Sequence, residues 1–126
     1  MDASIIGIIG GTGAQGQGLA LSFARAGHAV ILGSRSAGRA SKAADEVNDR
    51  LADGTGTVTG ADNLDASAMA DVVLLAVPYD GHADLVVDLR SHLAGKTVIS
   101  CVNPVGFDEQ GPYGLPVPDG SAAEEA

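Results

Sequence analysis

The hydrophobic positions of the chain form short runs rich in Ile, Val and Leu, which alternate with segments of helical spacing. Runs of this length and composition are typical of buried strands in a parallel sheet. The run at residues 71–78 is the clearest of them, and Pro78 ends it because proline cannot donate to a neighbouring strand. The pattern predicts five strands, at residues 5–9, 29–32, 57–59, 71–78 and 97–102.

Apolar residues at helical spacing separate these runs. Three helices are expected, at residues 14–26, 36–51 and 62–70. Residues 53–56 should break the second helix, and Met69 in the third is expected in the core. Asp80 is the expected N-cap of a fourth helix that ends at Gly95. The predicted buried face of this fourth helix comprises Ala83, Val86, Val87, Arg90 and Leu93.

Strands that alternate with helices predict βαβ units. The expected fold class is therefore α/β, a Rossmann-like, doubly wound, mainly parallel sheet with helices on both faces. In such a sheet a ligand binds at the carboxyl ends of the strands. The segments expected at that edge are residues 10–16, 33–35, 77–79 and 102–105.

The periodicity is lost after Val105. Residues 111–120 are rich in glycine and proline, which interrupt helices and strands. We therefore expect a domain at residues 1–106, followed by an irregular tail at residues 107–126. Ser121 and Glu124 then match a capping box, which announces the start of a helix. A helix of one turn is unstable alone. Either the tail is disordered or the chain is the front part of a longer protein, and we favour the second interpretation.

The composition fits one α/β domain. Apolar residues make up 45% of the 126 residues and aromatic residues only 3%, so the core should consist of Ala, Val, Ile and Leu. The single cysteine, Cys101, excludes an intramolecular disulfide and fits a reducing compartment. No stretch approaches the ~20 apolar residues of a membrane span, and the first apolar run lacks the basic leader of a signal peptide. We therefore expect a cytoplasmic protein without a membrane partner.

The net charge of −9 argues against nucleic-acid binding, but the charge is unevenly distributed. No carboxylate occurs between Asp2 and Asp45. The same interval holds four of the seven basic residues, namely Arg25, Arg35, Arg39 and Lys42. An anionic ligand bound near the first third of the chain explains this distribution best.

A glycine-rich turn lies inside this basic interval. Gly11, Gly13 and Gly16 form Gly-x-Gly-x-x-Gly between an expected strand and an expected helix, the context that a dinucleotide-binding turn requires. Gly11 permits the tight turn, Gly13 lets the backbone approach a pyrophosphate, and Gly16 lets the helix pack closely on the strand. The N–H groups at the start of the helix then favour phosphate. The turn is predicted to bind a dinucleotide.

The residues after the second strand indicate which dinucleotide binds. Enzymes that use NAD usually carry Asp or Glu there, to hold the ribose 2′-hydroxyl. Here the chain has Ser34 and Arg35, with Arg39 one helical turn further. A hydroxyl and two guanidinium groups bind a 2′-phosphate by charge-assisted hydrogen bonds, and Thr12 adds a hydroxyl to the phosphate region. NADP is the predicted nucleotide, unless the two arginines only occupy a solvated helix face.

These motifs resemble the NADPH-dependent coenzyme F420 reductase family, the F420H2:NADP oxidoreductases. Residues 10–20, 27–28 and 33–35 are similar to the opening of the family's sequences. Residues 76–79 are similar to its fourth-strand motif, and residues 98–105 to the end of its fifth strand. The combination of Gly-Gly-Thr-Gly with Gly-Ser-Arg is the most specific part of the resemblance.

The resemblance implies roles for individual residues. Val77, with Pro78 beside it, would lie along the nucleotide near its nicotinamide half, and Asn103 beside the nicotinamide. His82 would lie near the same half, but a lone histidine in the first turn of a helix is as often solvent-facing, and that alternative stays open. Gly11 belongs to the same cofactor-binding turn. Phosphate contacts are implied for Thr12, Gly13, Ala14 and Gln15, and 2′-phosphate contacts for Ser34, Arg35 and Arg39.

The reaction that the resemblance implies is direct hydride transfer between C4 of the nicotinamide of NADP(H) and C5 of the deazaflavin coenzyme F420. In this reaction the cofactors carry the chemistry. It needs no acid–base residue, and the sequence offers no convincing catalytic His, Cys or carboxylate pair, so we name no catalytic residue and no metal ligand. The family fold also implies a smaller C-terminal helical domain that closes over the deazaflavin and helps to form a homodimer.

Two other functions stay open at the level of sequence. Neighbouring families share this nucleotide domain, so the chain could be an NADP-dependent reductase of an imine, a keto acid or a flavin–metal centre. It could also be a non-catalytic NADP-binding module, because residues 1–126 contain no second domain.

Overall fold

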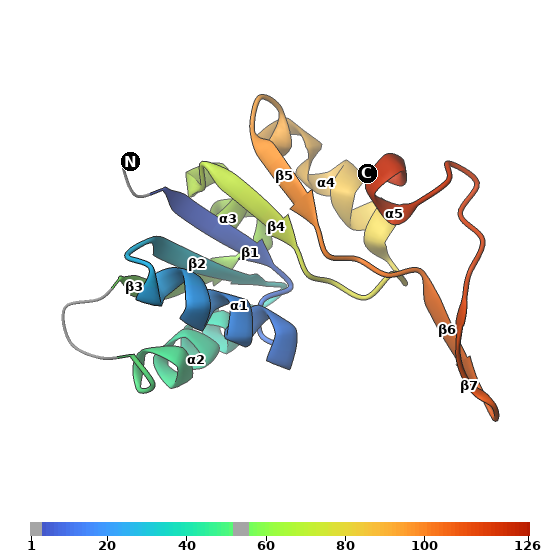
Figure 1. Ribbon diagram of the computed structural model, residues 1–126. Coiled ribbons are helices and arrows are strands. Elements are labelled where there is room, and N and C mark those ends of the chain that lie inside the picture. The colour runs from blue at the N-terminus through green and yellow to red at the C-terminus, as the bar shows by residue number, and fades with distance from the viewer. Residues whose placement is uncertain (1–3, 52–55) are drawn as a thin grey trace.

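The computed structural model describes residues 4–51 and 56–126. The break expected in the second helix, at residues 53–56, falls almost wholly outside these residues. In the described part of the chain, no helix has both the length and the apolar character needed to cross a membrane. Figure 1 shows the elements, which in chain order are β1 (Ile5–Ile9), α1 (Ala14–Arg25), β2 (Ala29–Ser34), α2 (Ala37–Asn48), β3 (Thr57–Asp62), α3 (Asn63–Met69), β4 (Val72–Leu75), α4 (His82–Leu93), β5 (Thr97–Ser100), β6 (Val105–Asp108), β7 (Gly111–Gly114) and α5 (Ala122–Glu125).

Five strands form one parallel sheet in the order β3-β2-β1-β4-β5. The chain runs outward from β1 through β2 to β3, then returns to β4 beside β1 and continues to β5 (Figure 1). This reversal between β1 and β4 opens a crevice at the carboxyl ends of those two strands. The arrangement confirms the expected Rossmann-like, doubly wound sheet.

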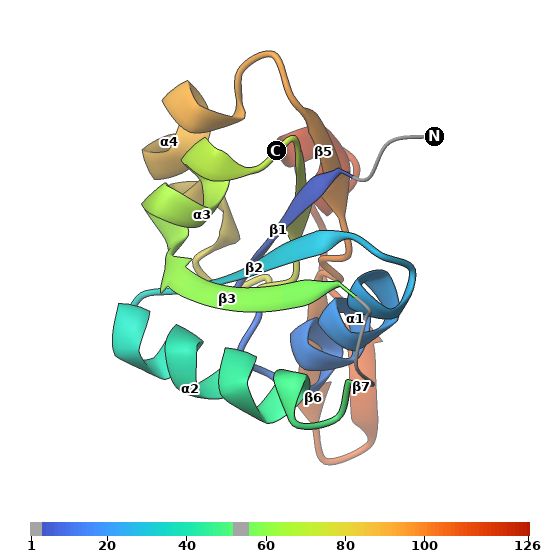
Figure 2. The ribbon, with the colours of Figure 1, turned by 90° about the vertical axis from the view of Figure 1, so that its left-hand side faces the viewer.

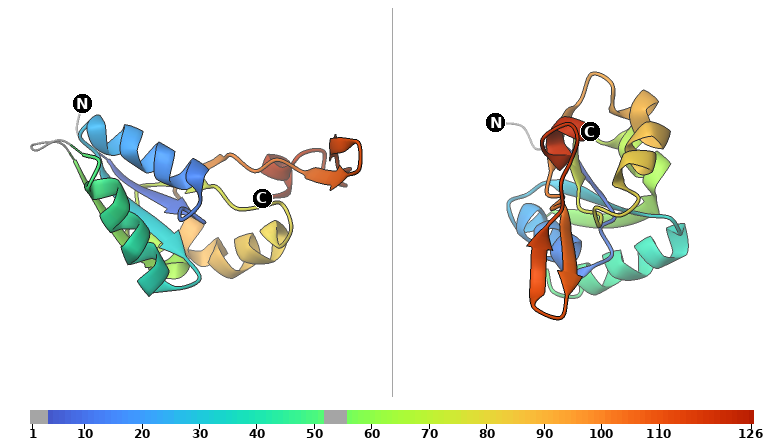
Figure 3. Two further views of the ribbon diagram at one scale, coloured as in Figure 1. Left: turned by 90° about the horizontal axis from the view of Figure 1, so that it is seen from below. Right: turned by 90° about the vertical axis from the view of Figure 1, so that its right-hand side faces the viewer.

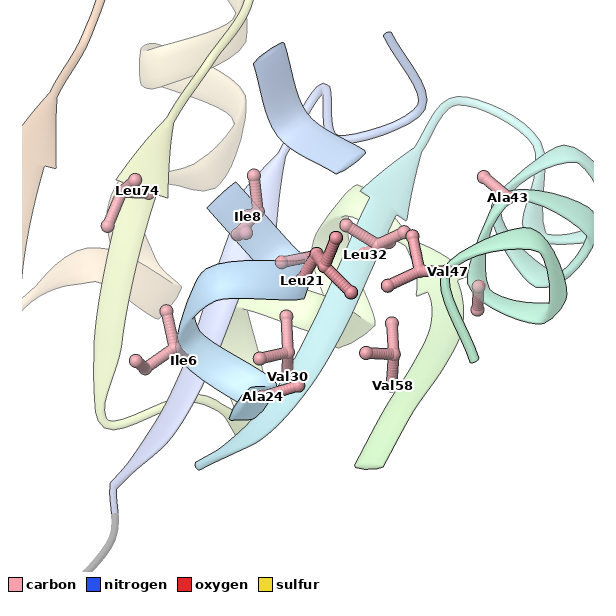
Figure 4. Packing of buried hydrophobic residues seen from close by; sticks show 12 residues of the cluster. Ile6, Ile8, Leu21, Ala24, Val30, Leu32, Ala43, Val47, Val58 and Leu74 are labelled. Atoms are coloured by element: carbon pink, nitrogen blue, oxygen red, sulfur yellow. The ribbon is translucent and has the colours of Figure 1, made fainter. Parts of the chain in front are cut away.

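Side chains of β1 alternate between the two faces of the sheet, as the geometry of a strand requires. Ile6 and Ile8 point to one face and pack with Leu21 of α1 and Val47 of α2 (Figure 4). Ile9 belongs to the opposite cluster, with side chains of β4, α3 and α4. Figure 2 shows α3 and α4 on the side of the sheet away from α1. Each buried isoleucine contributes about 1.5–3 kcal/mol, which explains why β1 is apolar throughout.

α3 packs unusually close to β1. A Cβ atom on Gly7 would lie only 2.9 Å from the carbonyl oxygen of Ala66 and from the Cβ of Ala70. Only small residues fit between α3 and the sheet, and the larger Leu64 and Met69 are therefore 48% and 53% exposed. The expectation that Met69 lies in the core is wrong.

α4 is rotated relative to its expected face. It buries His82, Val86 and Leu89, which lie at i, i+4 and i+7, whereas Val87 is 58% exposed. The predicted face is confirmed at Val86 and Leu93, which pack in the core cluster, but it left out His82 and Leu89. The N-cap is the glycine that follows the expected Asp80, and it has a φ of 82°.

Residues 105–114 form a hairpin and are not irregular. β6 and β7 pair antiparallel, with Asp108 opposite Gly111. The Asp108 carboxylate accepts the N–H of Gln110 at 2.8 Å and so stabilises the two-residue turn. Both strands are largely exposed, so no alternation of apolar and polar residues reveals them in the sequence. The hairpin extends away from the sheet beyond β5 (Figures 1 and 3).

α5 begins where the capping box predicts. The Ser121 hydroxyl accepts the N–H of Glu124 at 3.1 Å. Ala122 is buried in the same cluster as Ile9 and Leu89, so α5 packs back against the sheet and α4. The segment after the hairpin is therefore anchored to the domain.

Candidate functional site

A cleft of about 840 Å³ lies at the carboxyl ends of the strands. The four segments expected at this edge all contribute to it, because parallel strands bring their carboxyl ends together. The lining consists of residues from segments 10–15, 34–39, 76–81 and 101–107, together with Asn63 and Leu85.

The glycine-rich turn is held by backbone contacts. Gly10 has a φ of 74°, and the N–H of Gly11 donates to the carbonyl oxygen of Gly33 at 2.9 Å, which ties the turn to the end of β2. Gln17 Nε2 donates to the carbonyl oxygen of Thr12 at 3.0 Å. A Cβ on Gly16 would lie 2.4 Å from the Cα of Gly11, so α1 starts in direct contact with the turn. Gly11 itself is buried beneath the cleft and does not line it.

The start of α1 presents free donors to the cleft. Its N-cap, Gly13, provides no side-chain cap, and the first turn holds no acidic residue. A Cβ on Gly13 would meet open space, because this residue faces the cleft. By contrast, Ser36 caps α2 by accepting the N–H of Arg39. The uncapped N–H groups of α1 could therefore hold an anion, and Thr12, Ala14 and Gln15 line the cleft around them.

Positive charge lines the cleft at the end of β2. Ser34 is buried, and its Oγ accepts the N–H of Ser36 at 3.3 Å. Arg35 and Arg39 are exposed and line the cleft, and within residues 4–51 and 56–126 neither guanidinium is paired with a carboxylate. Two unpaired cations beside a serine hydroxyl suit a dianionic group such as a phosphate.

Asn63 is a cleft residue that the sequence analysis missed. It is the first residue of α3 and is 9% exposed. Its Oδ1 accepts the N–H of Gly10 at 3.4 Å, which links the end of β3 to the glycine-rich turn. The available signal was its position directly after the third strand, at the same sheet edge as the other segments.

The half of the cleft formed by β4, β5 and the hairpin is mainly apolar. Val77 and Pro78 line it after β4, and Asn103 lines it after β5, where the resemblance places them. Tyr79 and Phe107 also line this half, although no sequence pattern predicted a role for them. The remaining lining residues of this half include Leu85, Cys101 and Val105.

His82 does not line the cleft. Its side chain is fully buried, which contradicts the solvent-facing alternative. Its Nδ1 lies 2.9 Å from Oε1 of Glu125, and the Tyr79 hydroxyl donates to Oε2 of the same carboxylate at 3.0 Å. The hydrogen bond from His82, and to a smaller extent that from Tyr79, lowers the pKa of Glu125. Burial, followed by the hydrogen bond to Glu125, raises the pKa of Tyr79.

The geometry suits binding better than acid–base chemistry. One end of the cleft carries helix N–H groups and guanidinium groups, and the other end carries mainly apolar and aromatic side chains, with Asp80 and Asn103 as its polar members. Among the described residues, no group of three or more His, Cys, Asp or Glu side chains could hold a metal ion. An elongated ligand with phosphates at one end and a flat ring at the other fits this division.

Comparison with known proteins identifies the family. The model of the family described as "NADP oxidoreductase coenzyme F420-dependent" matches residues 5–104. The F420-dependent NADP reductase of Methanothermobacter thermautotrophicus is 46% identical over 100 residues, which cover 79% of this chain and 43% of that protein. That of Methanocaldococcus jannaschii is 37% identical over 123 residues, which cover 94% of this chain and 55% of that protein. The chain thus spans about half the length of these curated relatives.

Solved structures share the fold. A candidate F420-dependent NADP reductase from Arthrobacter sp. FB24 matches with a TM-score of 0.76 and 29% identity, over 98% of this chain and 56% of that one. A lactate dehydrogenase from Cryptosporidium parvum matches with a TM-score of 0.69 and 18% identity, over 83% and 39% of the two chains, which is a likeness of fold alone. With the family model matched from β1 to Pro104, the chain belongs to the family of coenzyme F420-dependent NADP oxidoreductases.

Proposed function

We propose that the chain binds NADP(H) in the cleft and that the bound nucleotide exchanges hydride with coenzyme F420. The observation that carries the proposal is the joint presence, in one cleft, of an uncapped helix N-terminus and two unpaired guanidinium groups. A pyrophosphate and a 2′-phosphate are the two anionic groups of NADP, and the cleft offers a separate site for each. Membership of the family supports coenzyme F420 as the second substrate.

The residues around the cleft fit the nucleotide by their chemistry. Gly13 and the N–H groups of Ala14 and Gln15 would hold the pyrophosphate, with the Thr12 hydroxyl beside them. Ser34, Arg35 and Arg39 would hold the 2′-phosphate by charge-assisted hydrogen bonds. The apolar half, with Val77, Pro78 and Asn103, would then receive the nicotinamide. This order agrees with the roles that the resemblance implies, except that His82 lies outside the cleft lining.

When both cofactors are bound, C4 of the nicotinamide and C5 of the deazaflavin supply the hydride chemistry. The role of this chain is to hold the nicotinamide in a fixed orientation and to exclude water from the apolar half of the cleft. We assign no acid–base residue to this chain.

Turnover assays with purified protein test the proposal. NADPH oxidation should require F420, and NADPH should bind more tightly than NADH. Binding of NADPH without turnover would support a nucleotide-binding module instead, a function that the limited coverage of the relatives also accommodates. Tight NADH binding with negligible NADPH affinity would contradict the assignment of Ser34 and Arg35. Oxidation of NADPH by an imine or a keto acid, but not by F420, would point to a neighbouring reductase family.

We further infer that residues 107–126 lead from the nucleotide domain of residues 1–106 into a second, helical domain, and that the protein is a cytoplasmic homodimer. Two observations support a second domain: the relatives are about twice as long as this chain, and the apolar side chains of Ile99 and Phe107 are 45% and 76% exposed. The reading frame beyond Ala126 tests the second domain, and the mass of the protein in solution tests the homodimer. A stop codon directly after Ala126, or a monomeric mass, would contradict them.

A further inference from the structure

The last helix is tied to the wall of the cleft through one carboxylate. Glu125 of α5 accepts a hydrogen bond from the Tyr79 hydroxyl through Oε2, at 3.0 Å. Its other oxygen, Oε1, lies 2.9 Å from Nδ1 of His82, the first residue of α4. The three side chains thus join α5 to the start of α4 and to the loop that follows β4.

The carboxylate partner of His82 sets the direction of their hydrogen bond. The side chain is fully buried, and its Nε2 has no hydrogen-bond partner among the described residues. An ionised carboxylate can only accept hydrogen bonds, so Nδ1–H of His82 donates to Glu125. The carboxylate therefore accepts two hydrogen bonds, one from His82 and one from Tyr79.

The Tyr79 ring is held from two directions. It stacks against the imidazole of His82, with ring centroids 6.0 Å apart and planes inclined by 29°. Its hydroxyl is bonded to Glu125, and its backbone carbonyl accepts the N–H of His82 at 3.0 Å. Because the same ring lines the cleft, whatever fixes its orientation also shapes the apolar half of the cleft.

We propose that Glu125 is a positioning residue of the cleft: by accepting hydrogen bonds from Tyr79 and His82 it docks α5 against the loop 76–81 and fixes the Tyr79 ring in the cleft wall. Glu125 acts through Tyr79, because no residue from 108 to 126 lines the cleft. The proposal goes beyond NADP binding and depends on the proposed function only for its second test.

The hydrogen-bonded network of Tyr79, His82 and Glu125 stays intact at neutral pH because of the charges around it. The hydrogen bonds from His82 and Tyr79 lower the pKa of Glu125, so its carboxylate stays ionised. Burial, Glu125 and the nearby Asp119 raise the pKa of Tyr79, so its hydroxyl stays protonated and keeps donating. At neutral pH the Glu125 carboxylate is therefore ionised and can accept, while the Tyr79 hydroxyl is protonated and can donate.

Tyrosine titration tests the network without any ligand. The chain has two tyrosines and no tryptophan, so Tyr113→Phe leaves Tyr79 as the single source of tyrosinate absorbance. In that background the pKa of Tyr79 should lie above the ordinary 10.0, and Glu125→Gln should lower it toward that value. Glu124→Gln is the matched control, because it removes the same charge one residue away and glutamine still fits the capping box. An unchanged titration in Glu125→Gln, or an equal change in the control, would overturn the proposal.

Hydrogen exchange and nucleotide affinity at neutral pH provide the second test. Glu125→Gln and Glu125→Ala should speed amide exchange at residues 79–82 and weaken NADPH binding about three- to tenfold, whereas Glu124→Gln should change the affinity less than about twofold. Unchanged exchange and affinity in both Glu125 variants would refute the positioning role. A wild-type chain that does not bind NADPH would count against the proposed function alone, and the exchange rates would still decide whether Glu125 holds Tyr79.

Discussion

The proposed preference for NADP over NAD depends on side chains at the end of β2. Arg35 lines the cleft without a carboxylate partner in the described residues, at the position where enzymes that use NAD carry an acid. Arg35→Asp should therefore weaken NADPH binding by about 10- to 100-fold, since it removes a charge-assisted hydrogen bond and adds repulsion. The affinity for NADH should change little. Calorimetric titration with both nucleotides measures the two effects.

Lys42→Asp is the control for this substitution. Lys42 lies on the exposed side of α2 and does not line the cleft, but the substitution changes the net charge equally. Its effect on NADPH affinity should be much smaller than that of Arg35→Asp. An equal loss of NADPH and NADH affinity in Arg35→Asp would show that Arg35 does not contact the 2′-phosphate.

Two glycines of α1 should respond to alanine in opposite directions. A Cβ on Gly16 would lie 2.4 Å from the Cα and 2.5 Å from the carbonyl oxygen of Gly11, and neither backbone atom can move aside cheaply. Gly16→Ala should destabilise the fold by about 1–3 kcal/mol. Gly18 lies on the same helix with open space around it, so Gly18→Ala should stabilise by about 0.5–1 kcal/mol. Urea unfolding of both variants checks the two signs, and a loss of stability in Gly18→Ala similar to that in Gly16→Ala would contradict the steric argument.

Single residues also show where sequence reasoning ends. The cleft residues of the glycine-rich turn and of the end of β2 could be predicted from the sequence, because glycines, a serine and arginines at that spacing have a known physical role in binding a dinucleotide. Asn63 could not, because its contact with Gly10 depends on how α3 approaches the sheet. His82 was expected near the nicotinamide, but it is buried against Glu125, a partner that lies 43 residues away in the sequence. Contacts of this range leave no local pattern.

At the scale of elements, the sequence predicted best where a sheet enforces periodicity. Strands β1 and β2 were predicted from the sequence, because their apolar side chains pack in the core. The face of α4 was assigned only in part, because the polar residue His82 begins its buried side. The hairpin β6–β7 was missed because both of its strands are largely exposed. Periodicity therefore reports burial and gives little information where an element lies outside the core.

The docking of α5 should be sensitive to acid. The pKa of Glu125 is lowered in the folded chain, so its contribution to stability is complete above the ordinary pKa of 4.5 and is lost as the pH falls through the lowered value. The stability difference between the wild type and Glu125→Gln should therefore be constant near neutral pH and shrink below about pH 4.5. Urea unfolding at a series of pH values measures it. A difference that grows as the pH falls would have the wrong sign for this network.

The charge of the whole molecule is arranged around the cleft. The chain carries a net charge of −9, yet the interval from residue 3 to residue 44, which builds β1, α1, β2 and most of α2, contains no carboxylate. These elements form the end of the cleft that holds Arg35 and Arg39, where we propose that the phosphates bind. The positive charge at this end would attract a phosphorylated ligand to a molecule whose net charge would otherwise repel it.

Salt should therefore weaken NADPH binding more than NADH binding. Screening shortens the reach of exposed charges from about 10 Å at 0.1 M salt to about 3 Å at 1 M, and Arg35 and Arg39 are both exposed. The dissociation constant of NADPH should rise roughly three- to tenfold over this range, and that of NADH about twofold or less. Arg39→Gln should reduce the slope for NADPH and leave the slope for NADH unchanged. Parallel slopes for the two nucleotides would mean that the pyrophosphate, and not the 2′-phosphate, receives the charge of this entrance, and the preference for NADP would then have to come from the Ser34 hydroxyl.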